Sequence, residues 1–371
     1  MKPLAPRRSR RTADDPATLR QVAERAGVSI ATVSRVVRGV DAVSDETTTR
    51  VQAAVLELGF RPNLRGRALA TRRHQAVGVV FPGLAGPYYS EVIAGFEEEA
   101  VASQLSVLIL GTHLLEHSRR LVLDMADRVD GIAVMGGSVP QDVLDALTKA
   151  RCPVVQLAGS PGAAVPTVRT AGAEPVRQLT RHLIEDHDYD RLVFVGNPTG
   201  SPDGEDRWNG FRQAHRDLGL PLPRTPLRAA HDQAGGLVAA DDLLGMRNRP
   251  RAAVCVNDEI AIGMLITLLG RGIRVPQDVA LTGFDNLPAA ALTAPGLTSV
   301  RQQMRELGSC TVRMLRTAID GGTDLPSEVE LPAEVVLRAS CGCAPDHPAG
   351  ATRPRTSHRA PSRPRRATAR A

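Results

Sequence analysis

Short β-rich runs alternate with helical stretches from residue 75 to residue 343, and this alternation limits the fold more than any other feature of the chain. Alternating strands and helices imply parallel sheets with helices on both faces. The strands are too many for one comfortable domain, so the sequence predicts an α/β body with two lobes. The predicted strands span 75–82, 106–110, 131–136, 154–159, 191–196, 252–257 and 279–285, and the clearest helical segments span 89–103, 173–186, 205–218 and 257–271.

Length and composition exclude several classes of protein. The 371 residues, 42% of them hydrophobic, suffice for two or three domains with sizeable cores. The longest apolar run, residues 260–270, is shorter than the roughly 18 residues that suggest a membrane span. No apolar segment of the secretory type follows the basic N-terminus, so a cytoplasmic location is expected. Five scattered cysteines argue against a disulfide framework.

The net charge of +6 is concentrated at the two ends of the chain, whereas the body is acidic. Basic ends indicate a polyanionic partner at the ends only. A basic N-terminal segment (1–15) and an Arg/Pro-rich tail (344–371) are both predicted to be disordered. For the tail, contact with nucleic acid and a simple contribution to solubility stay open as alternatives.

Two short helices joined by a glycine turn are predicted near the N-terminus. Thr18 and Gln21 fit a capping box at the start of the first helix, and Gly27 suits the left-handed turn at its end. Ser29 can cap the second helix through its hydroxyl. A third helix follows Ser44 and runs to Gly59. Helix, tight turn and helix form the sequence pattern of a helix-turn-helix.

The second of these helices is expected to bury Val33, Val36 and Val37 and to present small, polar and basic residues outward. Such a face suits the DNA major groove, whereas a turn between two core helices is the structural alternative. Arg35 is the candidate for guanine contact, and Ile30 and Ala31 are the candidates for contact with base edges. Phosphate contacts are expected from Ser29, Thr32 and Ser34.

The N-terminal sequence resembles the DNA-binding domain of the lactose-repressor (LacI/GalR) family. The resemblance rests on TLRQVAERAGVSIATVSRVVRG, on VSDETTTRVQAAVLELGFRPN and on RPNLRGRAL, which matches the family's hinge segment. It implies that Leu69 wedges into the minor groove. Gly66 departs from the usual alanine and costs about 0.5–1 kcal/mol of helix propensity. The predicted DNA-contacting residues are Thr18, Ser29, Ile30, Ala31, Thr32, Ser34, Arg35, Asn63 and Leu69.

No catalytic motif accompanies the predicted body. GxSxG, GxxxxGK[ST] and HExxH are all missing from the sequence. The residues that follow the strands instead suit binding of a polar, ring-shaped ligand: aromatic rings, an arginine fork and carboxylates. They are Tyr88, Tyr89, Arg207, Asn257, Asp258 and Asp285. We therefore expect a binding protein and not an enzyme, with no cofactor.

The body also resembles the effector domain of the same family. The resemblance rests on GPYYSEVIAGFEEEA, RVDGIAVM, DRWNGFRQA, VNDEIAIGML, VPQDVALTGFDN and LTSVRQ, and implies a periplasmic-binding-protein-like fold with a cleft between two lobes. It also implies that the cleft is lined by Tyr88, Tyr89, Arg207, His231, Asn257 and Asp285.

Two departures from the family pattern remove polar groups near the expected cleft. Ala158 stands where members commonly have Asp, and Ala171 with Gly172 stands where they often have Asp-Asn. These changes favour an effector with fewer hydroxyls than a plain hexose, or one that is held differently.

Cys341 and Cys343 form a C-x-C pair near the end of the predicted fold. No second cysteine cluster accompanies them, and none of the nine histidines stands at metal-ligand spacing from an acid or a cysteine. Two reduced thiols are therefore expected here, and no metal.

The favoured interpretation is a homodimeric or larger transcription repressor that reads operator DNA and responds to a sugar or related polar metabolite. A corepressor-type regulator, in which ligand promotes DNA binding, stays open, and a solute-binding receptor is the alternative from another class. The predicted parts are the N-terminal segment, a helix-turn-helix domain (16–61), a hinge (62–74), the effector-binding and dimerisation body (75–343) and the tail.

Overall fold

The computed structural model describes residues 17–37, 43–60, 73–112, 118–199, 201–322 and 324–344. The chain divides into two units, Met1–Gln75 and Ala76–Ala371. The predicted DNA contacts Asn63 and Leu69, most of the predicted hinge, the segment 1–15 and the tail beyond residue 344 lie outside the described residues. No described helix combines the length and the apolar character that a membrane crossing requires.

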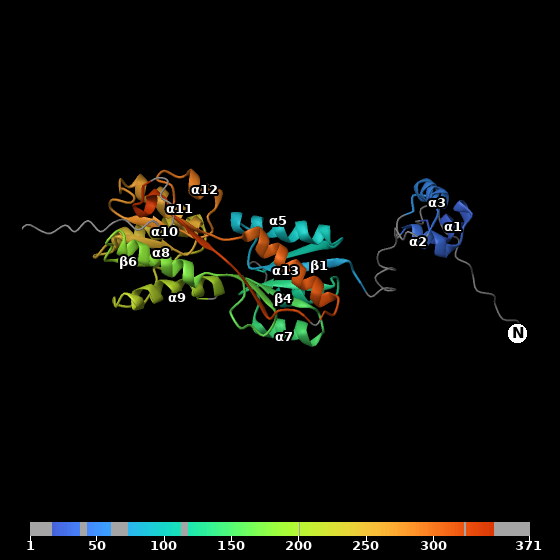
Figure 1. Cartoon of the computed structure of the whole chain (residues 1–371), viewed down its shortest axis with the longest axis horizontal. Helices are drawn as coiled ribbons and strands as arrows, with labels where there is room; N and C mark the ends of the chain where they lie inside the picture. The colour runs from blue at the N-terminus through green and yellow to red at the C-terminus, as the bar shows by residue number, and fades with distance from the viewer. Residues whose placement is uncertain are drawn as a thin grey trace, which may run out of the picture. The chain divides into compact units, whose positions relative to one another are not determined.

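The described residues of the first unit form the three helices that the sequence predicts. They are α1 (Leu19–Ala26), α2 (Ile30–Val37) and α3 (Asp45–Glu57), and they enclose a core around Val22, Val33 and Val51 (Figure 1). Thr18 and Gln21 form the predicted capping box, and Gly27 adopts φ 64° at the end of α1. Ser44 stands at the N-cap of α3, but its hydroxyl donates to Thr47 Oγ1 (3.0 Å) and makes no cap hydrogen bond with the backbone.

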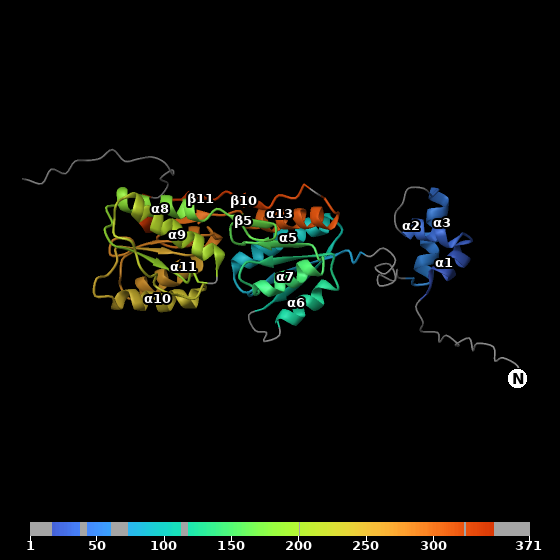
Figure 2. The same cartoon turned by 90° about the horizontal axis from the view of Figure 1, so that it is seen from below.

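A parallel six-stranded sheet organises the first lobe of the second unit, in the order β10-β5-β4-β3-β1-β2. Successive residues of β1 alternate between its faces: Val77 and Val79 pack against α5 and α13, and Val80 packs against α6 and α7. The two pairs of helices lie on opposite faces of the sheet (Figure 2). The elements are β1 (Ala76–Phe81), α5 (Pro87–Ala102), β2 (Ser106–Gly111), α6 (Ser118–Ala126), β3 (Gly131–Met135), α7 (Gln141–Lys149), β4 (Val154–Leu157), β5 (Thr167–Thr170), α13 (Met304–Ile319) and β10 (Glu328–Leu331).

A smaller parallel sheet, β6-β7-β8, forms the centre of the second lobe. Helices α8 and α9 cover one face of it, and α10 and α11 cover the other (Figure 2). The elements are α8 (Ala173–Glu185), β6 (Leu192–Val195), α9 (Pro202–Asp217), α10 (Gln233–Gly245), β7 (Ala252–Cys255), α11 (Asp258–Gly270), β8 (Ala280–Thr282), α12 (Pro288–Leu292), the antiparallel pair β9 (Ser299–Arg301) and β11 (Glu334–Val336), and the 3-10 turn η1 (Ala339–Cys341).

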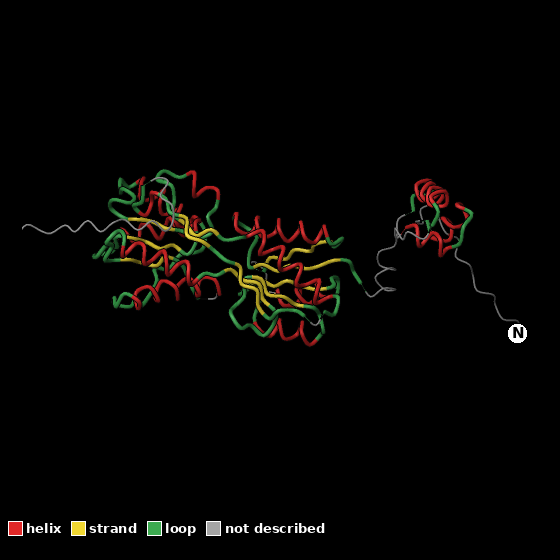
Figure 3. Tube along the Cα trace, in the orientation of Figure 1, coloured by secondary structure: helices red, strands yellow, loops and turns green. Residues whose placement is uncertain are grey.

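The chain passes between the two lobes at three places. It leaves the first lobe after β5 to form α8, returns after β9 to form α13, and crosses again between β10 and β11 (Figure 3). The predicted two-lobed α/β architecture is therefore confirmed. With three connections, a change in the angle between the lobes must be absorbed by a few residues at each crossing.

All seven predicted strands form, but four further strands were not predicted. β10 alternates charged and apolar residues (EVEL) because it lies at the edge of its sheet, where Glu328 pairs with Arg169. β9 and β11 have only three residues each, and β5 has a single apolar residue. β2, which the apolar run predicts to be buried, lies at the opposite edge and stays partly exposed. Sheet edges thus explain most of these differences.

Two glycines let α5 and α13 cross in backbone contact. A Cβ on Gly95 would lie 2.0 Å from the carbonyl oxygen of Arg305, and a Cβ on Gly308 would lie 2.2 Å from that of Val92. Only a hydrogen fits at either position, so the glycines set the distance between the helices.

Replacing Gly95 with alanine should lower the free energy of unfolding by about 1–3 kcal/mol, because the new methyl group forces α13 away from α5. Urea unfolding followed by circular dichroism measures the change. Gly270→Ala is the matched control, since a Cβ there meets nothing within 4 Å. Equal stability of the two variants would contradict the close crossing.

Candidate functional site

A cavity of about 530 Å³ lies between the two lobes. Pro82, Tyr89 and Met135 line it from the first lobe, and Asn197 and Arg228 line it from the second. A recess of about 90 Å³ adjoins the cavity. Cavity and recess share Tyr89, Met135, Ser201, Asp203 and His231.

Six of the seven side chains that the sequence predicts for ligand binding line the recess. The seventh, Asp258, is fully buried and accepts hydrogen bonds from Ser299 and Leu287, so its prediction as a ligand contact is wrong. Because the carboxyl ends of parallel strands point to one edge of a sheet, residues that follow different strands meet there. Tyr88 and Tyr89 begin α5 after β1, Arg207 lies on α9 after β6, and Asn257 and Asp285 follow β7 and β8. His231 precedes α10.

Arg207 is a tightly enclosed charge in the recess, with 6% of its surface exposed. Its Nη1 donates to the carbonyl oxygen of Val256 (2.6 Å) and lies 3.9 Å from Oδ1 of Asp285. Its Nη2 lies 3.7 Å from Oδ2 of Asp203, and the guanidinium carbon sits 3.6 Å above the Phe284 ring. Two carboxylates and a ring face therefore compensate a charge that water hardly reaches.

The two acids around Arg207 have raised pKa values, which favours their protonated forms. Burial raises the pKa of Asp203, although Arg207 opposes the shift. Burial raises the pKa of Asp285 well above its ordinary value; Arg207 opposes this shift and Asp258 adds to it. Gln302 Nε2 donates to Oδ1 of Asp285 (2.5 Å). A polar ligand thus meets both acceptors and donors at this end of the recess.

Two buried polar atoms of the recess have no hydrogen-bond partner among the described residues: the Tyr88 hydroxyl and Nε of Arg207. Burial, followed by the charge of Asp203, raises the pKa of Tyr88 well above its ordinary value, so the hydroxyl keeps its proton. An unsatisfied buried polar group costs about 1–3 kcal/mol. A bound molecule that pairs with these two atoms would remove that cost.

Hydrogen bonds link Asn257 to His231, and His231 to Asn197 in the loop after β6. The side-chain nitrogen of Asn257 donates to the His231 carbonyl oxygen (2.9 Å), and its oxygen caps α11 by accepting from Ile260 N (3.0 Å). Nε2 of His231 lies 3.2 Å from the amide nitrogen of Asn197. Asn257 therefore holds the loop that carries His231, besides lining the recess.

Sequence reasoning missed several polar groups of the cavity, including Asn197, Ser201, Asp203 and Arg228. Asn197 comes two residues after β6 and Ser201 caps the following helix α9, so the strand-end rule that found the other residues also applied to this loop. Ala158 lines the larger cavity, where the family pattern has an acid. At the other departure, the amides of Gly172 and Ala173 donate to Oδ2 of Asp206 (3.0 and 2.9 Å).

The predicted DNA-contacting residues in and just before α2 differ in their exposure. Ser29, Ala31 and Arg35 are exposed, and Ile30 is 50% exposed although it is a large apolar residue. Thr32 and Ser34 are half-buried. The Ser29 hydroxyl accepts from the amide of Thr32 (3.1 Å), which confirms its predicted role at the helix start.

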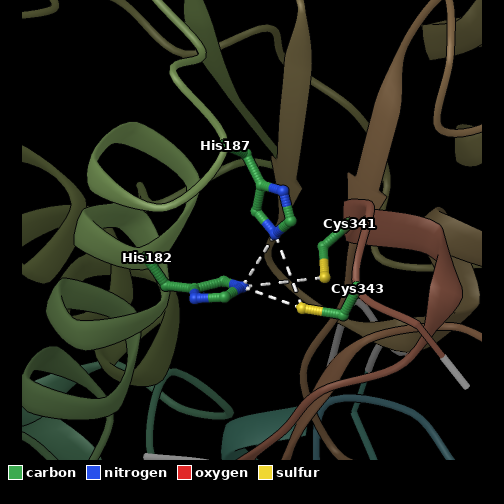
Figure 4. Close-up of side chains that lie close together, drawn as sticks. All are labelled: His182, His187, Cys341 and Cys343. Atoms are coloured by element: carbon green, nitrogen blue, oxygen red, sulfur yellow. Dashed lines mark hydrogen bonds between the residues drawn. The ribbon is translucent and has the colours of Figure 1, made fainter. Parts of the chain in front are cut away.

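One grouping of side chains has no counterpart in the sequence prediction. His182 and His187 lie against Cys341 and Cys343, the pair that the sequence interprets as two isolated thiols (Figure 4). Neither pair forms a recognised metal-binding motif by itself. About 150 residues separate the two pairs along the chain, so the sequence does not show that they meet. The clue was the short spacing within each pair.

The buried Asp258 predicts a pH dependence of stability. Its carboxylate accepts hydrogen bonds from Ser299 Oγ (2.6 Å) and Leu287 N (2.7 Å), and burial raises its pKa to about 7. In the unfolded chain the group titrates near 3.8. Folding therefore takes up a proton between these pH values, and the free energy of unfolding falls as pH rises through this window.

Asp258→Asn removes this titration. The stability of the natural chain relative to the variant should fall by up to roughly 1.4 kcal/mol per pH unit between about pH 4 and 7 and then level off. Urea unfolding followed by fluorescence of Trp208, which packs on Phe194 and Phe211 in the same lobe, measures the difference. A relative stability that rises with pH would show that the folded carboxyl has a lowered pKa.

Two family models match the chain. The model of bacterial regulatory proteins of the lacI family matches residues 18–63, and the model of a periplasmic binding protein-like domain matches residues 180–341. The first covers α1, α2 and α3, and the second covers most of the second lobe.

Whole-chain relatives agree with these matches. Catabolite control protein A of Priestia megaterium is 30% identical over 87% of this chain and 98% of its own length. The transcriptional repressor PurR of Haemophilus influenzae (strain PittEE) is 28% identical over the same shares.

Solved structures agree as well. The lac repressor dimer bound to operator and the anti-inducer ONPF superposes with a TM-score of 0.78 at 26% identity, over 88% of this chain and 99% of that one. The complex of the regulator CelR with cellobiose gives a TM-score of 0.66 at 28% identity, over 87% and 99%. The chain belongs to the lacI family of bacterial regulatory proteins, DNA-binding transcriptional regulators that small-molecule effectors control.

Proposed function

We propose that this chain is a repressor whose affinity for operator DNA is set by a small polar ligand bound in the recess between the lobes. One observation carries the proposal: six side chains from both lobes converge on the recess, and two of them present buried polar atoms without a partner among the described residues. The chain would act by binding alone, in the cytoplasm, without catalysing a reaction.

The chemistry of the recess favours a sugar or a related ring-shaped metabolite. Arg207 offers donors, and Asp203 and Asp285 offer oxygens that can accept and, when protonated, donate. Tyr88 and Tyr89 lie edge to face, with ring centroids 5.4 Å apart, and supply apolar surface. Ala158 leaves one wall of the larger cavity without a polar group, which favours a ligand that is apolar on that side.

Ligand binding would act on DNA through the angle between the lobes. A ligand that touches Tyr88 from the first lobe and Arg207 from the second favours the lobe arrangement that makes both contacts. Such a ligand can shift the balance only by its difference in affinity between the two arrangements. In a dimer the shift would alter the spacing of two helix-turn-helix domains, and with it their fit to a near-palindromic operator.

The sign of this control follows from which lobe arrangement fits DNA. Induction, in which ligand releases DNA, and corepression, in which ligand promotes DNA binding, use the same recess. A receptor without a transcriptional role is disfavoured, because the matched helix-turn-helix would have no purpose in it.

A thermal-shift screen of sugars, sugar phosphates and nucleobases tests the proposal, because any ligand that prefers the folded chain raises its melting temperature. Operator DNA selected from random duplexes by the natural chain then serves for binding assays with each hit. The proposal fails if no hit alters operator affinity in either direction.

Tyr88→Phe should weaken the binding of a hit about tenfold, or about 1.4 kcal/mol, while leaving the fold at least as stable. The substitution removes only a buried hydroxyl that has no partner among the described residues. Isothermal titration measures the affinity, and thermal melting measures the stability.

Thr282→Val is the matched control. It removes another buried hydroxyl without a partner among the described residues, in the second lobe but outside the lining of the recess. Ligand affinity should stay unchanged in this variant. Equal affinities of the natural chain and Tyr88→Phe would remove the hydroxyl from the ligand contacts.

Arg35→Ala should weaken binding to the selected operator by about 1–3 kcal/mol, the value of a specific base contact, and should leave the melting temperature unchanged because the side chain is exposed. Fluorescence anisotropy on operator and scrambled duplexes measures both affinities. Arg20→Ala on α1, an exposed arginine paired with Glu24, is the control. Equal losses on both duplexes would make Arg35 a phosphate contact.

A further inference from the structure

Four side chains that could hold a metal ion converge in the second lobe, apart from the residues that line the cavity and the recess. His182 lies in the last turn of α8, His187 lies between α8 and β6, and Cys341 and Cys343 lie at the end of the described fold. One ligating atom of each side chain lies within 4.8 Å of the other three, and Figure 4 shows all four pointing to a common centre.

Four of the six distances among these atoms lie close to the edges of a zinc tetrahedron. Zn–N bonds of about 2.0–2.1 Å and Zn–S bonds of about 2.3 Å imply N–N edges of roughly 3.3 Å and N–S edges of roughly 3.6 Å. The two Nε2 atoms lie 3.1 Å apart. Cys343 Sγ lies 3.3 Å from Nε2 of His182 and 3.5 Å from Nε2 of His187, and Cys341 Sγ lies 3.8 Å from Nε2 of His182.

A carboxylate orients one of the imidazoles. Nδ1 of His182 lies 2.7 Å from Oδ2 of Asp186, so Nδ1–H donates to the carboxylate. The lone pair of Nε2 then faces the cluster. Zinc-binding histidines usually have such an outer partner, which fixes both the tautomer and the direction of the ring.

The backbone around the cysteines is held firmly in place. The Tyr189 hydroxyl donates to the carbonyl oxygen of Cys341 (3.0 Å), and the Tyr189 ring stacks on the ring of His187. Gly342, between the cysteines, has φ 110°, and a Cβ there would lie 3.0 Å from Nδ1 of His187. The glycine therefore allows both the turn and the close approach of the imidazole.

The donor set selects the metal. Two thiolates and two neutral imidazoles in a tetrahedron suit zinc, and two thiolate charges neutralise a divalent ion in a partly buried place. Four protein ligands leave no position for substrate, which makes the site structural. Hydrogen bonds alone explain the cluster less well. Four atoms with lone pairs, two Nε2 and two Sγ, face one another, and few hydrogens are available to link them.

We propose that His182, His187, Cys341 and Cys343 bind one structural zinc ion, which fastens the end of the fold to the loop after α8. The ion would join parts of the chain about 160 residues apart and would add its binding free energy to the stability of the second lobe. The site does not depend on the proposed ligand recess, so either can fail without the other.

Metal analysis of the untagged full chain, purified under reducing conditions without chelator, tests the proposal. We expect one zinc per chain, a lower melting temperature after a strong chelator, and recovery when zinc alone is added back. Cobalt(II) in place of zinc should give the visible bands of a tetrahedral ion and a thiolate-to-metal charge-transfer band. A chain that neither carries zinc nor gains melting temperature from it would overturn the proposal, as would an octahedral cobalt spectrum.

Cys343→Ser should lose most of the bound zinc, and Cys152→Ser, which changes another half-buried cysteine, should keep it. His187→Gln gives an independent check if the cysteine variant does not fold. Full zinc content in both ligand variants would show that the ion sits elsewhere. A disulfide between Cys341 and Cys343 in the freshly isolated chain, or iron or copper in place of zinc, would also contradict the assignment.

Discussion

The guanidinium of Arg207 is a positive charge held where water hardly reaches, and the residues of the recess between the lobes surround it. Removing such a charge from water costs several kcal/mol unless partners compensate for it. Asp203, Asp285, the carbonyl of Val256 and the face of Phe284 provide that compensation. Nε stays without a partner among the described residues, so the compensation is incomplete until another molecule enters.

This incomplete compensation connects ligand binding to the arrangement of the lobes. Arg207, Asp203 and Asp285 belong to the second lobe, whereas Tyr88 and Tyr89 belong to the first. A ligand that completes the contacts of both sets bridges two bodies that three chain crossings join. The energy of binding is then available to select one angle between the lobes, which a regulator of DNA binding needs.

Local sequence patterns predicted the fold and most of the recess, because helix ends and buried strands depend mainly on residues that are close together in the sequence. The capping box at Thr18 and the left-handed Gly27 mark helix ends in any context, and apolar runs mark strands buried on both faces. The residues after those runs met at one edge of each sheet, as parallel topology requires. Edge strand β10 was missed because its Glu328 and Glu330 pair with Arg169, a contact that no local pattern contains.

Contacts between residues far apart along the chain determine the features that local sequence patterns did not predict. The proposed zinc-binding cluster depends on how closely η1 packs against the loop after α8, and about 150 residues separate its histidines from its cysteines along the chain. The second hydrogen bond of Asn257, to the loop of His231, likewise appears only when two strand ends are side by side. The sequence shows which residue types are present, whereas only the fold shows which side chains contact one another.

Reciprocal coupling between ligand and operator is the central claim, and one titration tests it most directly. The affinity of the full chain for a ligand from the screen is measured by calorimetry with and without saturating operator DNA. Because linkage requires each partner to change the affinity for the other by the same factor, operator should shift the ligand affinity roughly 5- to 150-fold in one direction. A ligand affinity that is unchanged by operator would contradict control of DNA binding through the recess.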